Sequence, residues 1–118
     1  MSIRRRLNSV HFALKGVTDL VKSQPNARIH LFATTLVIIA GFYFNISRIE
    51  WIAVIFCIAM VFSLEAVNTA LEYLTDLVSP EHHPLAGKAK DVAAAAVLIA
   101  VIGAVAVGLL VFIPHLLK

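Results

Sequence analysis

The chain has 118 residues, of which 60% are hydrophobic and only 14% are charged. Soluble domains are nearer to about 45–50% apolar and about 25% charged, so this composition disfavours a soluble single-domain enzyme and excludes a disordered chain. Ten Lys and Arg residues against seven Asp and Glu residues give a net charge of +3. That modest surplus fits the anionic face of a membrane better than it fits nucleic acid.

The first segment, residues 3–22, has the pattern of an amphipathic helix. Its apolar residues recur at steps of three and four, which places them on one face of a helix: Ile3, Leu7, Val10, Leu14, Val17 and Val21. The basic residues lie elsewhere around that helix. We therefore predict a helix that lies along the cytoplasmic surface of the membrane. Pro25 then suits the first turn of the next helix.

Three later stretches are long and apolar enough to cross a membrane. Residues 29–47 and 92–117 contain no Asp, Glu, Lys or Arg. A third apolar run starts at Trp51 and is interrupted by Glu65, but its helical pattern continues past the acid. We predict one all-α membrane domain over residues 1–118, with transmembrane helices at about 27–46, 51–78 and 89–114.

The distribution of basic residues predicts the orientation of these spans. Only Arg48 and Lys118 lie on one side. The other side carries Arg4, Arg5, Arg6, Lys15, Lys22, Arg28, Lys88 and Lys90. Because Lys and Arg are enriched in cytoplasmic loops, we expect the N-terminus and the loop between the last two spans to be cytoplasmic.

A row of polar side chains follows the middle span. Glu65, Asn68, Glu72 and Asp76 are spaced by three, four and four residues, so on a helix they project within roughly 80° of one another. An ionisable group at membrane depth costs about 2.5–3.5 kcal/mol, which predicts that the row faces a site or a protein interface. One interpretation is a hydrogen-bond network that holds an oligomer. Because several carboxylates would repel each other there, a divalent cation and a catalytic base are the favoured interpretation.

A second polar cluster follows, made of Glu81, His82, His83, Lys88, Lys90 and Asp91. Two adjacent histidines without further ligands at suitable spacing are weak evidence for zinc. Lys90 and Asp91 open the last helix, where backbone N–H groups and a lysine favour an anion, although a lipid-headgroup anchor is an alternative. The sequence contains neither of the common glycine-rich phosphate-binding motifs.

Two motifs resemble the prokaryotic diacylglycerol kinase family, which includes the undecaprenol kinases. They are Glu65-Ala-Val-Asn-Thr-Ala-Leu-Glu72 with Asp76, and Lys90-Asp91-Val-Ala-Ala-Ala-Ala-Val-Leu-Ile. The resemblance covers nearly the whole chain, including the basic surface helix and the three spans. The segments 26–30 and 50–52 are more similar to the undecaprenol-type branch.

The resemblance implies a homotrimer in the bacterial inner membrane, with active sites shared between neighbouring subunits on the cytoplasmic side. It implies transfer of phosphate from ATP, with Mg²⁺, to the hydroxyl of a lipid alcohol, either undecaprenol or diacylglycerol. Glu65 matches the general base, Asn68 a nearby polar residue and Glu72 a metal-binding carboxylate that also belongs to the ATP site. The other positions that match nucleotide contacts are Asp76, Glu81, His83, Lys90 and Asp91, with Arg5 and Phe12 in the surface helix.

One position departs from the family pattern. A glutamate that commonly joins the metal site just before the first span is replaced here by Gln24. An amide oxygen can ligate Mg²⁺ but brings no negative charge, so weaker metal binding or a degenerate enzyme acting as a membrane scaffold are both open. A further alternative is a small oligomeric transporter that uses Glu65 as a proton or cation site.

Overall fold

The computed structural model describes residues 2–118 and, within them, consists of helices joined by short turns. The helices are α1 (Ile3–Ser23), α2 (Pro25–Phe44), α3 (Arg48–Val78) and α4 (Pro84–Leu116). The last three are each long and apolar enough to cross a membrane. The predicted all-α fold with three membrane spans is therefore confirmed, whereas the position of α1 on the membrane surface stays a prediction.

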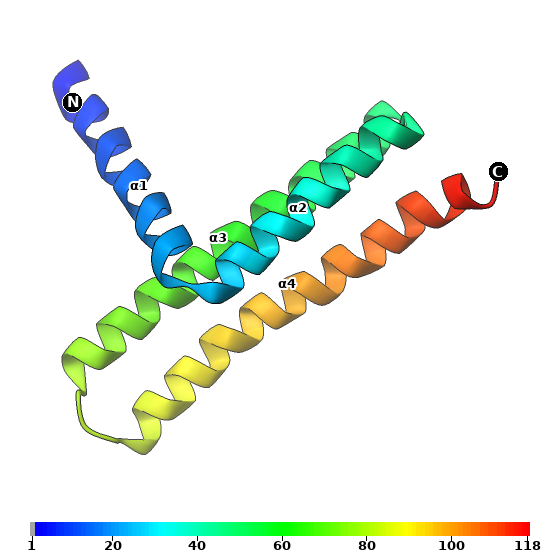
Figure 1. Cartoon of the computed structure of the whole chain (residues 1–118). Helices are drawn as coiled ribbons and strands as arrows, with labels where there is room; N and C mark the ends of the chain where they lie inside the picture. Colours follow the sequence, from blue (N-terminus) through cyan, green and yellow to red (C-terminus); the bar gives the residue numbers. More distant parts are fainter. Residues whose placement is uncertain (1) are drawn as a thin grey trace.

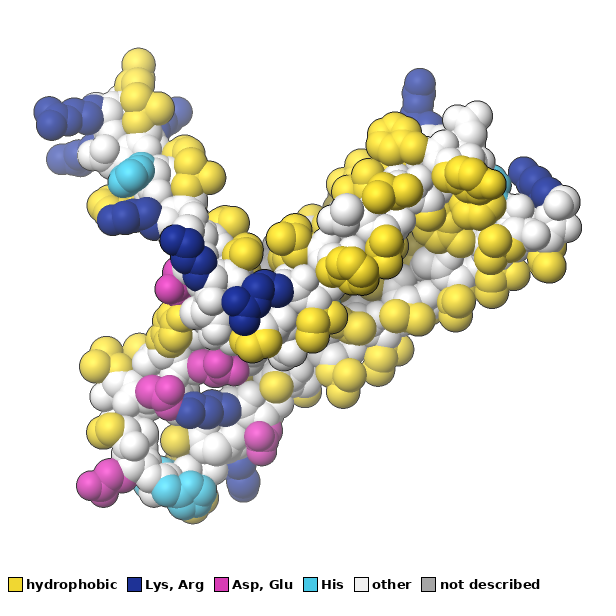
Figure 2. Space-filling model, viewed as in Figure 1, with side chains coloured by type: hydrophobic (Ala, Val, Ile, Leu, Met, Phe, Trp, Pro, Cys, Tyr) yellow, Lys and Arg dark blue, Asp and Glu magenta, His cyan; other side chains and the backbone are white. Residues whose placement is uncertain are grey.

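The helices α3 and α4 form a long antiparallel hairpin, which is the most extensive helix pair in the protein (Figure 1). Helix α2 lies along α3 with fewer contacts. Helix α1 leaves the bundle at a steep angle and touches it only near its C-terminal end (Figure 1). Charged side chains gather on α1 and at the end of the hairpin near its connecting loop, while the rest of the visible surface is largely apolar (Figure 2).

Local capping chemistry sets the helix boundaries. Asn45 adopts the left-handed conformation (φ 51°) and its N–H bonds the carbonyls of Gly41 and Phe42, which ends α2. Ser47 and Glu50 then form a capping box at the start of α3, because each side chain accepts a hydrogen bond from the other residue's backbone N–H.

Helices α2 and α4 both begin at a proline. Helix α2 begins at Pro25, which confirms the place predicted for this proline, whereas α4 begins at Pro84 rather than near residue 89. A proline at the first helical position has its φ preset for a helix and lacks an N–H that would be unpaired there anyway. At α4, the ring Nδ1 of His83 accepts a hydrogen bond from Leu85 N (3.1 Å), so this histidine serves as the N-cap.

One cluster of buried apolar side chains lies at the end of the bundle far from the acidic row. Ile46, Val54 and Val111 form its centre. Partly buried side chains pack around it, namely Val37, Phe44, Trp51, Ile58, Val107 and Phe112. Most other large apolar side chains are exposed in the single protomer. Such exposure suits a chain whose solvent is lipid or a neighbouring subunit.

The same end of the bundle is fastened by a polar contact. The Nε2 atom of His115, near the C-terminus of α4, lies 3.2 and 3.1 Å from the two carboxylate oxygens of Glu50. Glu50 therefore caps α3 and bonds α4 at the same time. This contact ties together the two ends of the hairpin that are far from its connecting loop.

Candidate active site

The polar row of α3 runs from the interior of the protomer to its surface. Glu65 is 1% exposed, and Asn68 and Thr69 are also buried. Glu72 is half-buried and Asp76 is exposed. The hydroxyl of Thr69 donates to the backbone carbonyl of Glu65 (2.9 Å), so it is already used within the helix. Glu65 is thus the most deeply buried ionisable side chain of the described residues.

The end of α1, next to its corner with α2, lies beside this buried part of the row. Leu20 and Ala27, on either side of the corner, are buried. Residues of α1 between 13 and 20 and residues of α3 between 66 and 73 line a common cleft. The corner itself is Gln24, whose extended backbone (φ −109°) ends α1 and precedes Pro25.

A hydrogen-bond pair holds the corner in place. The hydroxyl of Tyr73 on α3 donates to Oδ2 of Asp19 (2.7 Å) and lies 3.1 Å from Oγ of Ser23. Sequence reasoning missed these contacts, because Asp19 and Tyr73 are 54 positions apart. The sequence indicated only that Tyr73 brings a hydroxyl into the apolar pattern of the middle span.

Two buried oxygen atoms of the row have no hydrogen-bond partner in residues 2–118. They are Oε2 of Glu65 and Oδ1 of Asn68. Buried polar atoms are nearly always paired, because an unpaired one costs about 1–3 kcal/mol. Both atoms accept hydrogen bonds or bind cations. The buried part of the row therefore presents two open acceptors.

The part of the row formed by Asn68 and Glu72 suits a divalent cation with few protein ligands. Nδ2 of Asn68 donates to Oε1 of Glu72 (3.3 Å), which orients that carboxylate. Among residues 2–118 no three His, Cys, Asp or Glu side chains are grouped for a metal. Mg²⁺ is often held by one or two carboxylates together with substrate phosphates, so Glu72 beside the open oxygen of Asn68 fits it. The side-chain Nε2 of Gln24 donates to Oγ of Ser23 (3.5 Å).

Charged residues at the end of the row connect α3 to α4. Lys90 forms an ion pair with Asp76, and both side chains are partly exposed. Asp91 is the next residue of α4 and is exposed. The structure thus brings one predicted cation to the end of the acidic row, which lowers the repulsion among the carboxylates.

The remaining predicted nucleotide contacts lie apart from the row within one protomer. Arg5 and Phe12 are exposed on α1, whose N-terminal part points away from the bundle (Figure 1). Glu81 and His83 are exposed in the loop between α3 and α4. Only the group formed by Glu65, Asn68, Glu72, Asp76 and Lys90 lies along one continuous path on the hairpin.

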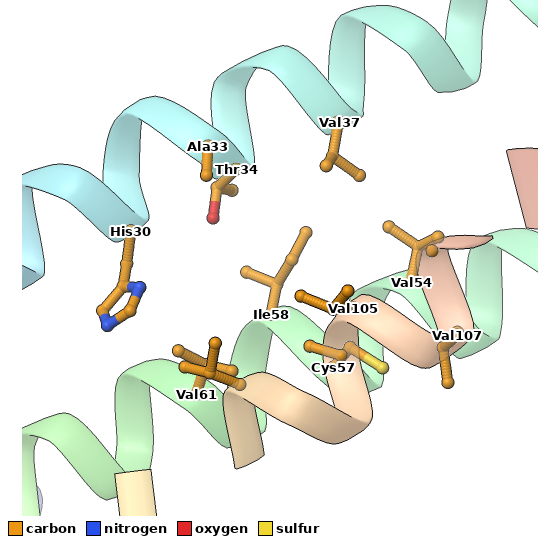
Figure 3. A pocket seen from close by; sticks show the side chains of 13 residues that line it. His30, Ala33, Thr34, Val37, Val54, Cys57, Ile58, Val61, Val105 and Val107 are labelled. Carbon is orange, nitrogen blue, oxygen red and sulfur yellow. The ribbon is translucent and has the colours of Figure 1, made fainter. Parts of the chain in front are cut away.

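An apolar cavity of about 230 Å³ lies between α2, α3 and α4. Its walls include Val54, Cys57 and Val61 from α3 and Val101, Ala104 and Gly108 from α4. His30 closes one end, and its imidazole points from α2 toward α3 (Figure 3).

The imidazole of His30 also reaches the acidic row. Its Nε2 atom lies 3.6 Å from Oε2 of Glu65, so the two residues connect the cavity to the row. Sequence reasoning assigned no role to His30. The available signal was an ionisable ring in an otherwise apolar span.

Comparison with known proteins bears out the resemblance. A family described as prokaryotic diacylglycerol kinase matches residues 11–112. The chain is 39% identical over 114 residues to an undecaprenol kinase of Bacillus subtilis, with 97% of this chain and 93% of that protein covered. It is 41% identical over 113 residues to a diacylglycerol kinase of Synechocystis sp. (95% and 65% covered), and 33% identical over 108 residues to one of Haemophilus influenzae (90% and 92%). The chain therefore belongs to the prokaryotic diacylglycerol kinase family.

Proposed function

We propose that this protein is an integral-membrane lipid kinase that transfers the γ-phosphate of ATP to the hydroxyl of a lipid alcohol, undecaprenol or diacylglycerol. The reaction takes place at the cytoplasmic face of the bacterial inner membrane. Family membership supports the phosphotransfer, and the basic residues at the N-terminus and in the loop between α3 and α4 support the cytoplasmic orientation.

The buried carboxylate of Glu65 is the observation that carries this proposal. A carboxylate that is 1% exposed and has an unpaired oxygen is costly, and its retention indicates a task. It lies seven residues before Glu72, which is about 10 Å along a helix. With that spacing, Glu65 can act as the base for the lipid hydroxyl while Glu72 serves the phosphate end of the site.

The reaction follows from these positions. Glu65 accepts the hydroxyl proton while the lipid oxygen forms a bond to the γ-phosphorus. The bond from that phosphorus to the β–γ bridging oxygen breaks, and ADP leaves. Asn68 orients Glu72, and Lys90 brings positive charge to the same end of the row. Mg²⁺, held by Glu72 with Gln24 as a neutral second ligand, would neutralise phosphate charge when bound.

The apolar cavity supports a lipid acceptor rather than a soluble one. It is lined almost entirely by aliphatic side chains, and its one ionisable end is His30 beside Glu65. A molecule with an apolar chain and a terminal hydroxyl has this same distribution of polarity. Undecaprenol and diacylglycerol both satisfy it, and the aliphatic lining does not discriminate between them.

The proposed assembly is a homotrimer with sites shared between subunits. The separation of Arg5, Phe12, Glu81 and His83 from the row within one protomer supports this, because a neighbour's α1 or loop would complete the nucleotide site. The open acceptor of Asn68 supports it as well.

The test is a phosphotransfer assay on the purified protein in bilayers with γ-labelled ATP. Diacylglycerol and undecaprenol are supplied in separate reactions. Label in the lipid fraction is the expected result, and the better acceptor identifies the substrate. If neither lipid is labelled and the protein instead carries protons or cations across sealed vesicles, the kinase proposal is wrong and a transporter is supported.

A further inference from the structure

The contact between His30 and Glu65 joins two helices at the most deeply buried carboxylate of the protein. The side chain of Glu65 is 2% exposed and that of His30 is 19% exposed. The edge of the His30 ring also packs against Phe62 of α3, with ring centroids 6.3 Å apart and an angle of 82° between the rings. The imidazole thus lies between α2 and α3, within 4 Å of the carboxylate of Glu65.

The separation of 3.6 Å between Nε2 and Oε2 is longer than a hydrogen bond. Oε2 therefore remains without a donor in the described chain. A small rotation of the imidazole toward α3 would bring Nε2 within hydrogen-bond distance. Because no group among residues 2–118 donates a hydrogen bond to Oε2, we take the nearby Nε2–H of His30 as its donor.

We propose that His30 is the positioning residue of the base Glu65. Its Nε2–H closes onto Oε2 and holds the carboxylate so that the other oxygen, Oε1, faces the lipid hydroxyl and accepts its proton. This inference rests on the proposed kinase function, and it adds a residue from α2 to a site otherwise built on α3 and α4. His30 itself does not touch the reacting atoms.

The surroundings of His30 favour this single pairing. From α3, Glu65 is the acid within ion-pair distance in the described residues, and Cys57 is a second titratable group on the same cavity wall. From α4, the cavity is lined by aliphatic residues and glycine. On α2 itself, the guanidinium of Arg28 is directed toward α1, where it donates to the backbone carbonyl of Lys22 (3.4 Å).

Kinetics of His30→Ala and His30→Gln in lipid bilayers test the proposal. We expect His30→Ala to lower kcat by about tenfold to a hundredfold, because a misplaced catalytic group loses rate steeply, and to leave KM for ATP unchanged. His30→Gln keeps a side-chain N–H donor and should recover most of kcat. The control is Thr35→Ala, on an exposed residue of α2 whose hydroxyl donates to the backbone carbonyl of Leu31, which should behave as the unaltered protein.

Added imidazole provides a readout that a purely structural role would not change. In His30→Ala, free imidazole can occupy the vacated space and should raise kcat. Thiophene, which has a similar size but lacks an N–H, should not. A gain with both compounds would mean that His30 only fills space, and this would overturn the proposal.

A spectroscopic measurement separates this inference from the kinase proposal. In ¹⁵N-histidine-labelled protein, Glu65→Gln should shift the ring resonances of His30 and leave those of His82 unchanged. If the unaltered protein phosphorylates lipid but His30→Ala keeps its kcat, His30 is not a positioning residue and the kinase stands. If no lipid is phosphorylated, the kinase proposal and this role for His30 both fail. If His30→Ala does not assemble, the kinetics of His30→Gln and the spectrum test the proposal instead. A His30 resonance that does not shift in Glu65→Gln refutes the contact.

Discussion

The phenol oxygen of Tyr73 donates a 2.7 Å hydrogen bond to Oδ2 of Asp19, and this bond fastens the end of α1 to α3. Both residues line the cleft between α1 and α3, whose wall also includes the buried Thr69. The bond therefore connects the placement of α1 to the buried part of the acidic row.

Tyr73→Phe should loosen α1 without removing an aromatic ring. The exposed bond should be worth about 1 kcal/mol, so we expect faster amide hydrogen exchange in residues 13–23 and little change in α4. Hydrogen exchange of the protein in detergent or nanodiscs measures this. The matched control is Tyr43→Phe, on an exposed tyrosine of α2 whose ring packs against Phe44. Equal exchange in both variants would show that the bond does not hold the helix.

Glu65→Gln should abolish turnover while the protein stays folded. The amide cannot accept the hydroxyl proton, so we expect kcat to fall by about a hundredfold or more. Because a neutral amide is less costly to bury than an unpaired carboxylate, thermal stability should be unchanged or higher. Ser63→Ala, on an exposed position of the same helix, is the control. Near-normal turnover in Glu65→Gln would exclude this residue as the base.

Gln24→Glu should raise the apparent affinity of the enzyme for Mg²⁺. If position 24 joins Glu72 in holding the metal, a carboxylate there adds negative charge to the site, so half-maximal rate should be reached at a lower Mg²⁺ concentration. Asn26→Asp adds the same charge two residues away on an exposed position and serves as the control. If the two variants shift the Mg²⁺ dependence equally, the effect is general electrostatics and position 24 is not a metal ligand.

Gly41→Ala should destabilise the packing of α2 on α3. A Cβ at this position would lie 2.6 Å from Cη2 of Trp51, so the indole would have to move. Overpacking of this kind costs about 1–3 kcal/mol, against a gain in helix propensity of about 1 kcal/mol. Thermal unfolding in detergent should show a lower midpoint than for Gly103→Ala, where the added methyl group meets nothing within 4 Å. A midpoint at least as high as that control would mean that Trp51 does not constrain this position.

The number and order of helices were predictable because they depend on local properties of the sequence. Charge-free runs are long enough to span, and a helical pattern continues past Glu65. The start of α4 at Pro84 was missed by a few residues, because His83 supplies a cap that depends on side-chain orientation. The row from Glu65 to Asp76 could be placed on one face of a helix for the same local reason.

Contacts between helices were not predictable from a single sequence. The pair of His30 with Glu65 and the pair of Glu50 with His115 depend on how far one helix slides along another. A shift of one residue rotates a helical side chain by about 100°, and no local pattern specifies that register. The same reason explains why His30 was not assigned to the candidate site.

Two contacts on either side of the corner limit how this chain can change in length. Asp19 accepts a hydrogen bond from Tyr73, and His30 lies 3.6 Å from Glu65, with the break at Gln24 between them. An inserted or deleted residue anywhere from 20 to 29 would preserve one contact and turn the other side chain away. Length variation among natural homologues should therefore avoid this stretch.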